Sequence, residues 1–281
     1  MHKNLETTQK STQKYRDSIL RDLCKDKERA IGVVNAITGS NYGIDTKITL
    51  HDLESSLSKR YNDVAISVEN ELLVMIEHQS TINPNMPFRL LSYCIDVWRS
   101  TFVKRDNLYS KQIHKIPTPK FYILYNGTEP LKENVLSLSK MFQLPPEENS
   151  VELNVYVVDI NYQSQDEVLV KSDALGGYAY LIEKIREYQA EGLSRDKSIA
   201  TAIQHCIQNN ILQEFLKNNY DRVIDMFNWE HDEEAEKNVI RREAMEQEKL
   251  DIAKNLLSMN LSIGDIVKAT GLTPEVIDTL K

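Results

Sequence analysis

The strongest constraint on the fold is a pair of neighbouring segments in which apolar and polar residues alternate with a period of two. Residues 61–68 (YNDVAISV) and 71–79 (ELLVMIEHQ) both show this pattern, with little more than Glu69 and Asn70 between them. Side chains of a β-strand point alternately to its two faces. The pattern therefore predicts two antiparallel strands joined by a tight turn.

The register of this hairpin follows from its two faces. A turn centred on Asn70 pairs residues whose numbers add up to 140, and one face is then wholly aliphatic. A shift by one residue would scramble both faces, so the register is well specified. On the opposite face Asp63 becomes the direct neighbour of Glu77, and Gln79 lies two residues further along.

Two carboxylates at paired positions of a hairpin suggest a metal site. Directly paired residues have Cβ atoms roughly 4.5–5.5 Å apart, so Asp63 and Glu77 repel each other unless a cation or a proton intervenes. Oxygen ligands favour Mg²⁺ or Mn²⁺. The spacing alone leaves a second interpretation open, in which both acids simply lie on the solvated face of an amphipathic hairpin.

The remaining pattern predicts strands and helices on both sides of the hairpin. A helical segment at 15–38 divides in two near residues 25–28, with Asp26 as an N-cap and Gly39 as a stop. Further strands are expected at 46–50, 121–127 and 151–161, and helices at 87–103, about 130–142, 175–190, 194–209 and 211–227.

The domain organisation follows from the same pass. We expect a polar tail at 1–12, a main domain at 13–228, an acid-rich helix at 229–258 and a helix–turn–helix-like hairpin at 259–281. The last segment has too few basic residues to grip phosphates well. An oligomerisation or partner-docking role, such as homo-oligomer formation through the C-terminal helices, is therefore at least as good an interpretation.

Composition excludes some classes of protein. The formal net charge is −8, which argues against a protein that coats nucleic acid through its overall charge. No segment approaches the length of about 20 apolar residues that spans a bilayer. Cys24, Cys94 and Cys206 are far apart and lie among apolar residues, so buried free thiols in a reducing cytoplasm are expected.

Several blocks resemble the Rpn family of bacterial recombination-promoting nucleases, whose members are also described as transposases. They are DKERAIGVVNAITGSNY (26–42), the run from NDVAIS through LVMIEHQSTINPNMPFRLLSY, and PTPKFYILYNGTEP (117–130). The resemblance covers roughly residues 13–225. It implies an α/β (α+β) fold with a PD-(D/E)XK restriction-endonuclease-like core, a mixed central sheet and a helical C-terminal region.

The resemblance also implies magnesium-dependent cleavage of DNA. Asp63 matches the first metal-binding acid of the family and Glu77 the second. Gln79 stands where the wider superfamily has lysine, and glutamine cannot act as a base. Deprotonation of the attacking water would then depend on the metal or on a lysine elsewhere, such as Lys120.

Two further residues are candidates by their position. Glu28 matches the extra acid that many such nucleases place on the first helix, although acids are ordinary in a first helical turn. Arg89 lies in the first turn of the helix after Gln79, where it is placed to contact phosphate, although exposed arginines are commonly just solvated. A nuclease-like fold without turnover, acting as a binding or regulatory module, is the alternative to an active endonuclease.

Overall fold

The computed structural model describes residues 18–51, 63–259 and 261–280, and the side chains of residues 63, 105, 107 and 229–244 lie outside that description. The predicted polar tail at 1–12 therefore falls outside the described residues. The chain divides into two compact units, one that ends at Met226 and one that begins at Phe227.

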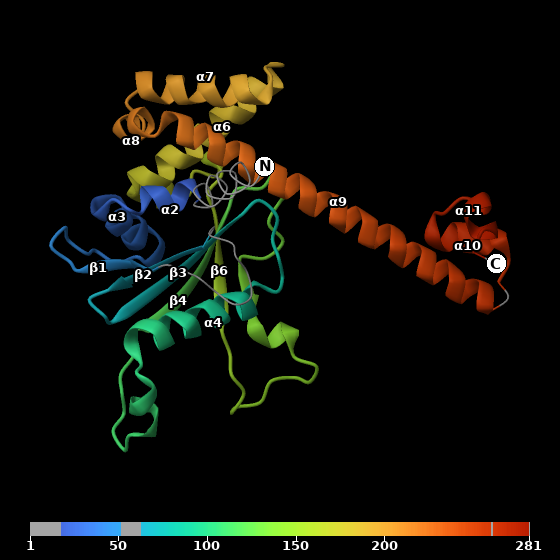
Figure 1. The fold of residues 1–281 in the computed structure, drawn as a ribbon, viewed down its shortest axis with the longest axis horizontal. Helices are drawn as coiled ribbons and strands as arrows, with labels where there is room; N and C mark the ends of the chain where they lie inside the picture. Colours follow the sequence, from blue (N-terminus) through green and yellow to red (C-terminus); the bar gives the residue numbers. More distant parts are fainter. Residues whose placement is uncertain (1–17, 52–62, 260, 281) are drawn as a thin grey trace, which may run out of the picture. The chain divides into compact units, whose positions relative to one another are not determined.

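Within the described residues the first unit is built on one six-stranded mixed sheet, with the order β1-β2-β3-β4-β6-β5 (Figure 1). Strands β1, β2 and β3 form an antiparallel meander, β4 and β6 continue it in parallel, and β5 runs antiparallel to β6 at the edge. The bounds are β1 Ile48–His51, β2 Asp63–Val68, β3 Leu72–Gln79, β4 Thr118–Tyr125, β5 Val135–Ser137 and β6 Asn154–Asp159.

The predicted register of the β2–β3 hairpin is confirmed for all its described pairs. Asp63 pairs with Glu77 at one end and Val68 with Leu72 at the other. The aliphatic face and the acidic face are therefore separated as the sequence predicts.

The turn of this hairpin uses a backbone conformation that is unusual outside glycine. Glu69 and Asn70 both have positive φ, at 50° and 58°. The amide of Glu71 donates to the carbonyl of Val68 at 2.9 Å and closes the turn. Positive φ at both central residues belongs to the tight turns whose twist matches that of the flanking strands.

Helix α4 (Met86–Val97) covers the face of the sheet that carries Glu77 (Figure 1). The core beneath it includes Leu73 and Met75 of β3, which are fully buried. The packing of α4 therefore encloses most of this face. A π-helical turn, Trp98–Phe102, extends α4, so the predicted helix at 87–103 is confirmed with a change of geometry in its last turn.

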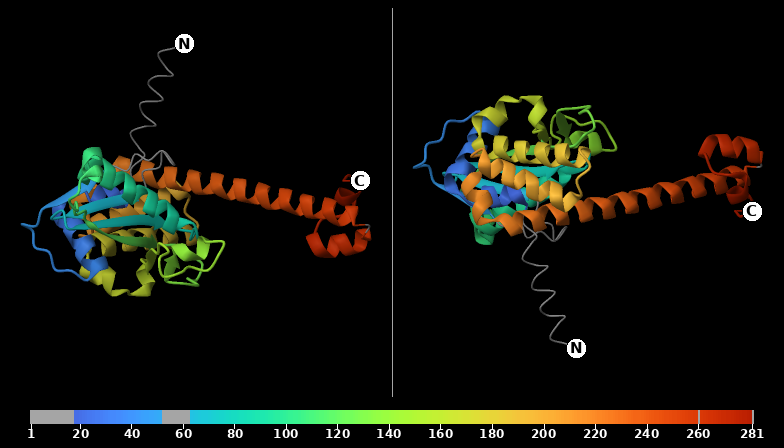
Figure 2. Two further views of the ribbon diagram at one scale, coloured as in Figure 1. Left: turned by 90° about the horizontal axis from the view of Figure 1, so that it is seen from below. Right: turned by 90° about the horizontal axis from the view of Figure 1, so that it is seen from above.

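The opposite face of the sheet is covered by helices that precede and follow it. Helix α2 contacts β2, and α6 reaches the sheet through Tyr178, whose ring packs edge-on against His78 of β3. The helices of this layer are α2 Ile19–Leu23, α3 Lys27–Thr38, α5 Glu167–Lys171 and α6 Asp173–Ala190, and α7 (Arg195–Gln208) and α8 (Gln213–Asn218) pack outside α6. Figure 2 shows the same arrangement from two further sides.

The division of the first helical segment is confirmed. The side chain of Asp26 accepts from the amide of Arg29 at 2.9 Å and caps α3. Gly39 ends the helix with a φ of 70°, a conformation that favours glycine.

Residues 130–142 do not form the predicted short helix. They form the edge strand β5, followed by a 3-10 turn at Leu138–Met141. Leu136 of β5 pairs with Val155 of β6 and enters the core beneath α4. Pairing with a neighbouring strand and burial of one side chain outweigh the helical pattern of so short a segment.

The predicted helix boundary near residue 228 is also wrong. Helix α8 ends at Asn218, and α9 runs without interruption over Tyr220–Ser258. Neither glycine nor proline occurs between residues 220 and 258, so the sequence holds no strong stop signal there.

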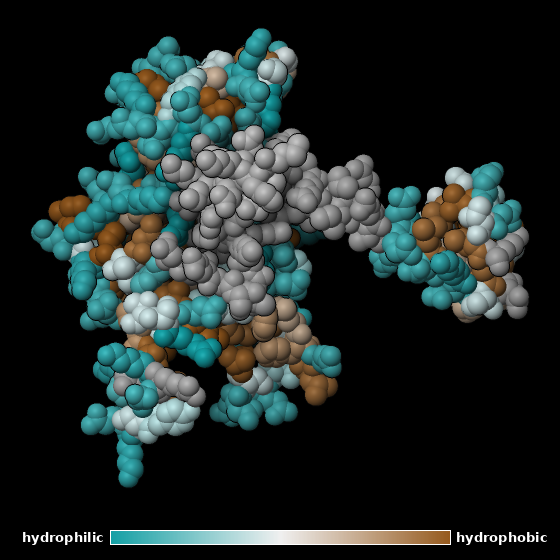
Figure 3. Space-filling view, viewed as in Figure 1, coloured by the Kyte–Doolittle hydropathy of each residue, from teal (hydrophilic) through white to brown (hydrophobic). Residues whose placement is uncertain are grey.

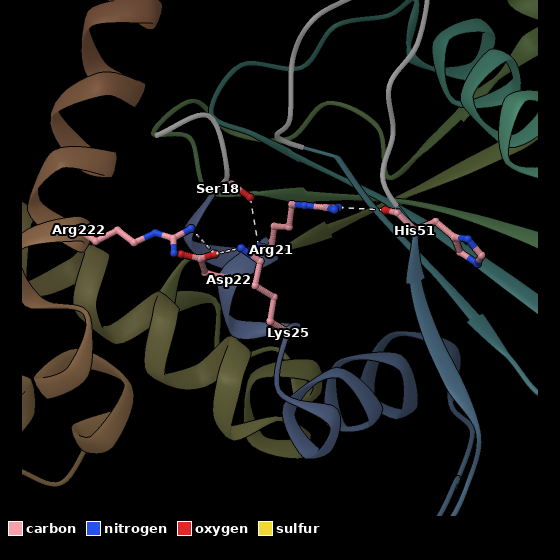
Figure 4. A network of polar contacts seen from close by, with 6 residues as sticks. All are labelled: Ser18, Arg21, Asp22, Lys25, His51 and Arg222. Atoms are coloured by element: carbon pink, nitrogen blue, oxygen red, sulfur yellow. Dashed lines mark hydrogen bonds and ion pairs between the residues drawn. The ribbon is translucent and has the colours of Figure 1, made fainter. Parts of the chain in front are cut away.

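A buried acid joins α9 to α2. Asp22 is buried and forms ion pairs with two cations, as Figure 4 shows. Its Oδ1 lies 2.6 Å from Nζ of Lys25 and 2.8 Å from Nη2 of Arg222 in α9. Beside it the Arg21 guanidinium donates to the carbonyl of His51, the last residue of β1, at 3.1 Å. A buried carboxylate is tolerated when cations compensate it, so this network ties α9 and β1 to α2.

The second unit consists of the C-terminal part of α9, α10 (Ile263–Thr270) and α11 (Pro274–Asp278). Ala253, Ile266 and Ile277 form its small core. Hydrophobic atoms lie among hydrophilic ones on its surface (Figure 3). Ser262 caps α10 and Gly271 ends it, as predicted.

The cysteines behave as the sequence predicts. Cys24, Cys94 and Cys206 are free and buried, and burial raises the pKa of each thiol to about 12. Within the described part of the chain, none of the helices combines the length and the apolar character that crossing a bilayer requires.

Candidate catalytic and metal-binding site

The hairpin brings Asp63 and Glu77 to directly opposite positions at the end of β3. Glu77 is buried beneath the start of α4, with its side chain only 7% exposed. Ionised carboxylates rarely stay in such places without a compensating charge. The surroundings of Glu77 therefore decide what this position can do.

Arg89 supplies positive charge at this position. Its Nη2 lies 3.2 Å from Oε1 of Glu77, and its side chain is 25% exposed. The same guanidinium donates to the hydroxyl of Tyr93, one helical turn further along α4, at 3.2 and 3.3 Å. Arg89 also lies over the Tyr93 ring, 5.8 Å from its centre. Helix α4 thus presents a held, partly exposed cation to the buried acid.

The environment of Arg89 keeps it charged. Burial alone would lower the pKa of the guanidinium, but the Glu77 carboxylate and the Tyr93 hydroxyl raise it, and the net direction is upward. A cation that is this firmly protonated and still partly open to solvent can bind an incoming phosphate.

Gln79 is buried at the end of the same strand face. Its side-chain oxygen accepts from the amide of Asn83 at 3.0 Å, and its carbonyl accepts from the amide of Asn126 at 3.1 Å. The side chain therefore holds the start of the loop that leads into α4. The role predicted for Gln79, orienting a water or a phosphate, stays a prediction.

Lys120 does not join this group. It pairs in register with Val74 of β3, so it lies on the face of the sheet opposite to Glu77 and Gln79. A base for the attacking water is therefore not brought to Glu77 by β4.

Glu28 occupies the first turn of α3 and is exposed. Helix α3 packs mainly on α5 and α6. Among the described side chains, no three acids, histidines or cysteines gather closely enough to hold a metal ion. The metal-binding role predicted for Asp63 and Glu77 and the role predicted for Glu28 stay predictions.

A pocket of about 820 Å³ opens beside the carboxyl ends of β3 and β4. Its walls include Ser80, Ile82 and Pro84 from the loop after Gln79, together with Tyr125 of β4 and residues from 129–141. Ends of parallel strands are common places for ligand binding. The walls are both apolar and polar, and Ser80, which follows Gln79 in the chain, is one of the lining residues.

The segment Tyr125–Gly127, at the end of β4, has a structural explanation that the sequence alone did not supply. A Cβ atom at Gly127 would collide with the carbonyl of Ser80 and the ring of Tyr125. The carbonyl of Asn126 accepts from Arg186 of α6, whose Nη1 also donates to Asn161 at 2.8 Å. Close approach of two loops at the end of the sheet therefore requires a residue without a side chain.

The fold and the hairpin together define a class of protein. This is a mixed α/β protein with a PD-(D/E)XK-like core and a helical C-terminal region, as the sequence predicted. The family described as "Putative transposase, YhgA-like" matches residues 50–238, and the chain belongs to this family.

A curated relative supports the resemblance to the Rpn family. The chain is 23% identical over 248 residues to "Recombination-promoting nuclease RpnA" of Escherichia coli (strain K12), with 79% of this chain and 80% of that protein covered. No solved structure matches the chain.

Proposed function

We propose that this protein is a metal-dependent DNA endonuclease that hydrolyses phosphodiester bonds, and that Asp63 and Glu77 hold the metal. The observation that carries the proposal is the register of the hairpin, which pairs these two acids at one end of β3. The name of the relative, a recombination-promoting nuclease, supports DNA as the substrate and a link to recombination or mobile elements.

The donor set fits Mg²⁺ or Mn²⁺. Magnesium in phosphate-processing sites takes one or two protein carboxylates and completes its shell with water and substrate oxygens. Asp63 and Glu77 supply that number. When bound, such an ion polarises the phosphate and activates water.

The other residues of the site act on the substrate. Arg89 can exchange its contact with Glu77 for a phosphate oxygen, because its side chain is partly exposed and carries a fixed charge. Gln79 holds the adjoining loop through Asn83 and thereby fixes where the substrate backbone can pass. In this proposal Arg89 binds a phosphate of the substrate, and Gln79 positions the loop beside it.

Cleavage of supercoiled plasmid DNA in millimolar Mg²⁺ or Mn²⁺ tests the proposal. Asp63→Asn and Glu77→Gln remove charge with little change of shape, and each should lower the rate by about a hundredfold or more, since metal stabilisation supplies several kcal/mol. The matched control is Glu71→Gln, an exposed acid in the turn of the same hairpin. Unchanged cutting by both site variants would show that the activity comes from elsewhere.

Metal binding is measured separately from cleavage. Electron paramagnetic resonance measures the concentration of free Mn²⁺ as protein is added to a Mn²⁺ solution. This concentration should fall when the parent or Glu71→Gln is added and should remain high when Asp63→Asn or Glu77→Gln is added. A parent that binds no divalent ion at millimolar concentration would instead support the alternative, a nuclease-like binding or regulatory module without turnover.

A further inference from the structure

The segment that follows Gln79 has a charge opposite to that of the rest of the chain. Residues 80–117 contain six basic and only two acidic residues, a net charge of +4. Because the whole chain carries −8, the remainder carries −12. This basic segment comprises the loop after β3, helix α4, the π-helical turn and the connection to β4.

The last part of the basic segment, residues 103–117, is an arm that projects from the end of α4 (lower left of Figure 1). Trp98 holds both of its ends. The carbonyl of Trp98 accepts from the amide of Val103 at 2.8 Å, and its indole nitrogen donates to the carbonyl of Pro117 at 3.2 Å. A surface loop whose ends are held together in this way is frequently functional.

The arm exposes large apolar side chains between its basic ones. Leu108 is 68% exposed, Tyr109 81% and Ile113 94%. Lys111 and Lys115, within two residues of Ile113, are exposed as well. These three side chains lie within six residues of the sequence, and contiguous exposed apolar side chains commonly mark a binding surface.

The arm lies at a defined distance from the candidate site. Glu77 is in register with Ile123 of β4, five residues beyond Thr118, where the arm enters the strand. At about 3.3 Å per residue this separates Glu77 from the base of the arm, at Thr118, by roughly 17 Å along the sheet. Arg89, the first cation of the basic segment, already contacts Glu77, so positive charge extends from the site to the arm.

The separation between Glu77 and the base of the arm can be expressed in base pairs of duplex DNA. Neighbouring phosphates along one strand of a duplex are separated by about 3.4 Å of helix axis, so roughly 17 Å corresponds to about five base pairs. Basic side chains bind phosphates, while apolar side chains such as isoleucine and leucine are the kind that DNA-bending proteins insert between base steps. The arm offers both.

We propose that residues 80–117 form a binding surface for duplex DNA, in which the arm binds the backbone and the base of the arm lies about half a helical turn from the phosphate held near Arg89 and Glu77. This inference rests on the proposed function for the identity of the substrate. It adds a binding element outside the catalytic hairpin, one that explains how a chain of net charge −8 binds a polyanion.

Equilibrium binding without cleavage tests the inference. A fluorescent duplex is titrated with the full-length protein in Ca²⁺, at several salt concentrations, and the dissociation constant is followed by anisotropy. The arm variant is Lys111→Gln with Lys115→Gln. The matched control is Lys197→Gln with Lys217→Gln, two exposed lysines on α7 and α8. Both variants lose two positive charges.

The arm variant should bind roughly tenfold more weakly, and its plot of log affinity against log salt should be shallower by about 2, since each phosphate contact contributes about 0.9. The control should match the parent in both. A second arm variant, Tyr109→Ala with Ile113→Ser, should weaken binding while leaving the salt slope nearly unchanged.

The outcomes separate this inference from the proposed function. A parent that cuts DNA, together with an arm variant that binds like the parent, would overturn the role of the arm and leave the nuclease proposal standing. A parent that binds DNA through the arm but never cuts would support the arm alone. A parent that binds no duplex would overturn both. The arm variant could also lose the parent's binding to phosphatidylserine vesicles while it binds the duplex as the parent does. That result would overturn the inference and indicate that the arm binds a membrane surface instead.

Discussion

Arg89 and Glu77 form an ion pair between a helix and the strand that precedes it, with Nη2 of Arg89 3.2 Å from Oε1 of Glu77. The Glu77 side chain is nearly buried, and the Arg89 side chain is partly open to solvent. Removing one partner of such a pair leaves an uncompensated charge behind. The pair therefore both stabilises the fold and holds a cation where substrate would enter.

Arg89→Ala should lower the free energy of unfolding by about 2 kcal/mol, because Glu77 loses its ion pair with Arg89 while remaining buried. Millimolar Mg²⁺ should restore more stability to this variant than to the parent, since the bound ion replaces the positive charge of Arg89. Urea unfolding with and without Mg²⁺ measures both effects. Arg99→Ala, an exposed arginine beyond the same helix, is the control and should change neither value. Equal responses to Mg²⁺ in the two variants would argue against a metal at Glu77.

His78 should make stability depend on pH. Burial lowers its pKa from 6.5 to about 4, against a smaller opposing effect of Asn126. As pH falls, the unfolded chain takes up the proton first, so this contribution to stability is fully present above pH 6.5 and is lost between pH 6.5 and 4. Between pH 6.5 and 5 the loss amounts to about 1.5 kcal/mol.

The measurement for His78 is urea unfolding at pH 6.5 and pH 5. His78→Gln removes the titrating group, so the variant should lose about 1.5 kcal/mol less than the parent over this interval. His114→Gln changes an exposed histidine of the arm and should lose as much as the parent. A pH dependence that is the same in all three proteins would mean that His78 does not stay neutral.

Gly127 should tolerate no larger residue. In Gly127→Ala the new methyl group meets the carbonyl of Ser80 and the ring of Tyr125. Such overpacking typically costs about 1–3 kcal/mol, and here it would also displace the loop that begins after Gln79. Gly43→Ala is the matched control, because no atom lies within 4 Å of its added methyl group. Thermal unfolding should show a lower midpoint for Gly127→Ala alone.

The hairpin could be predicted from sequence because two requirements agree on one register. The face with Val64 is aliphatic at every paired position, and a shift by one residue would mix this face with the one that carries Asp63 and Glu77. Arg89 could be recognised as a candidate but its partner could not, because the contact depends on how α4 packs across β3. The periodicity of a sequence describes one helix or strand at a time and does not specify how a helix crosses a strand.

The face on which Lys120 lies shows the same limit. Its strand was predicted, but the parallel register that pairs it with Val74 is a tertiary fact. The edge strand β5 was missed because three residues are too few for a period to be read. Long alternating segments were therefore predictable, whereas the pairing of distant or short segments was not.

Trp98 should control how well the arm is ordered. Trp98→Phe keeps an aromatic ring but removes the indole donor that holds Pro117, 3.2 Å away. A single such hydrogen bond contributes about 1 kcal/mol, so global stability should fall only slightly, while the arm should open more often. Limited trypsin digestion, followed by mass spectrometry, should then show faster cleavage after Lys111 and Lys115. Ser100→Ala removes a hydrogen bond from the π-helical turn to the carbonyl of Val97 in α4 and should leave the cleavage rate of the arm unchanged. If both variants are cut at the parent's rate, the indole contact does not hold the arm, and the folded chain around Thr118 must do so instead.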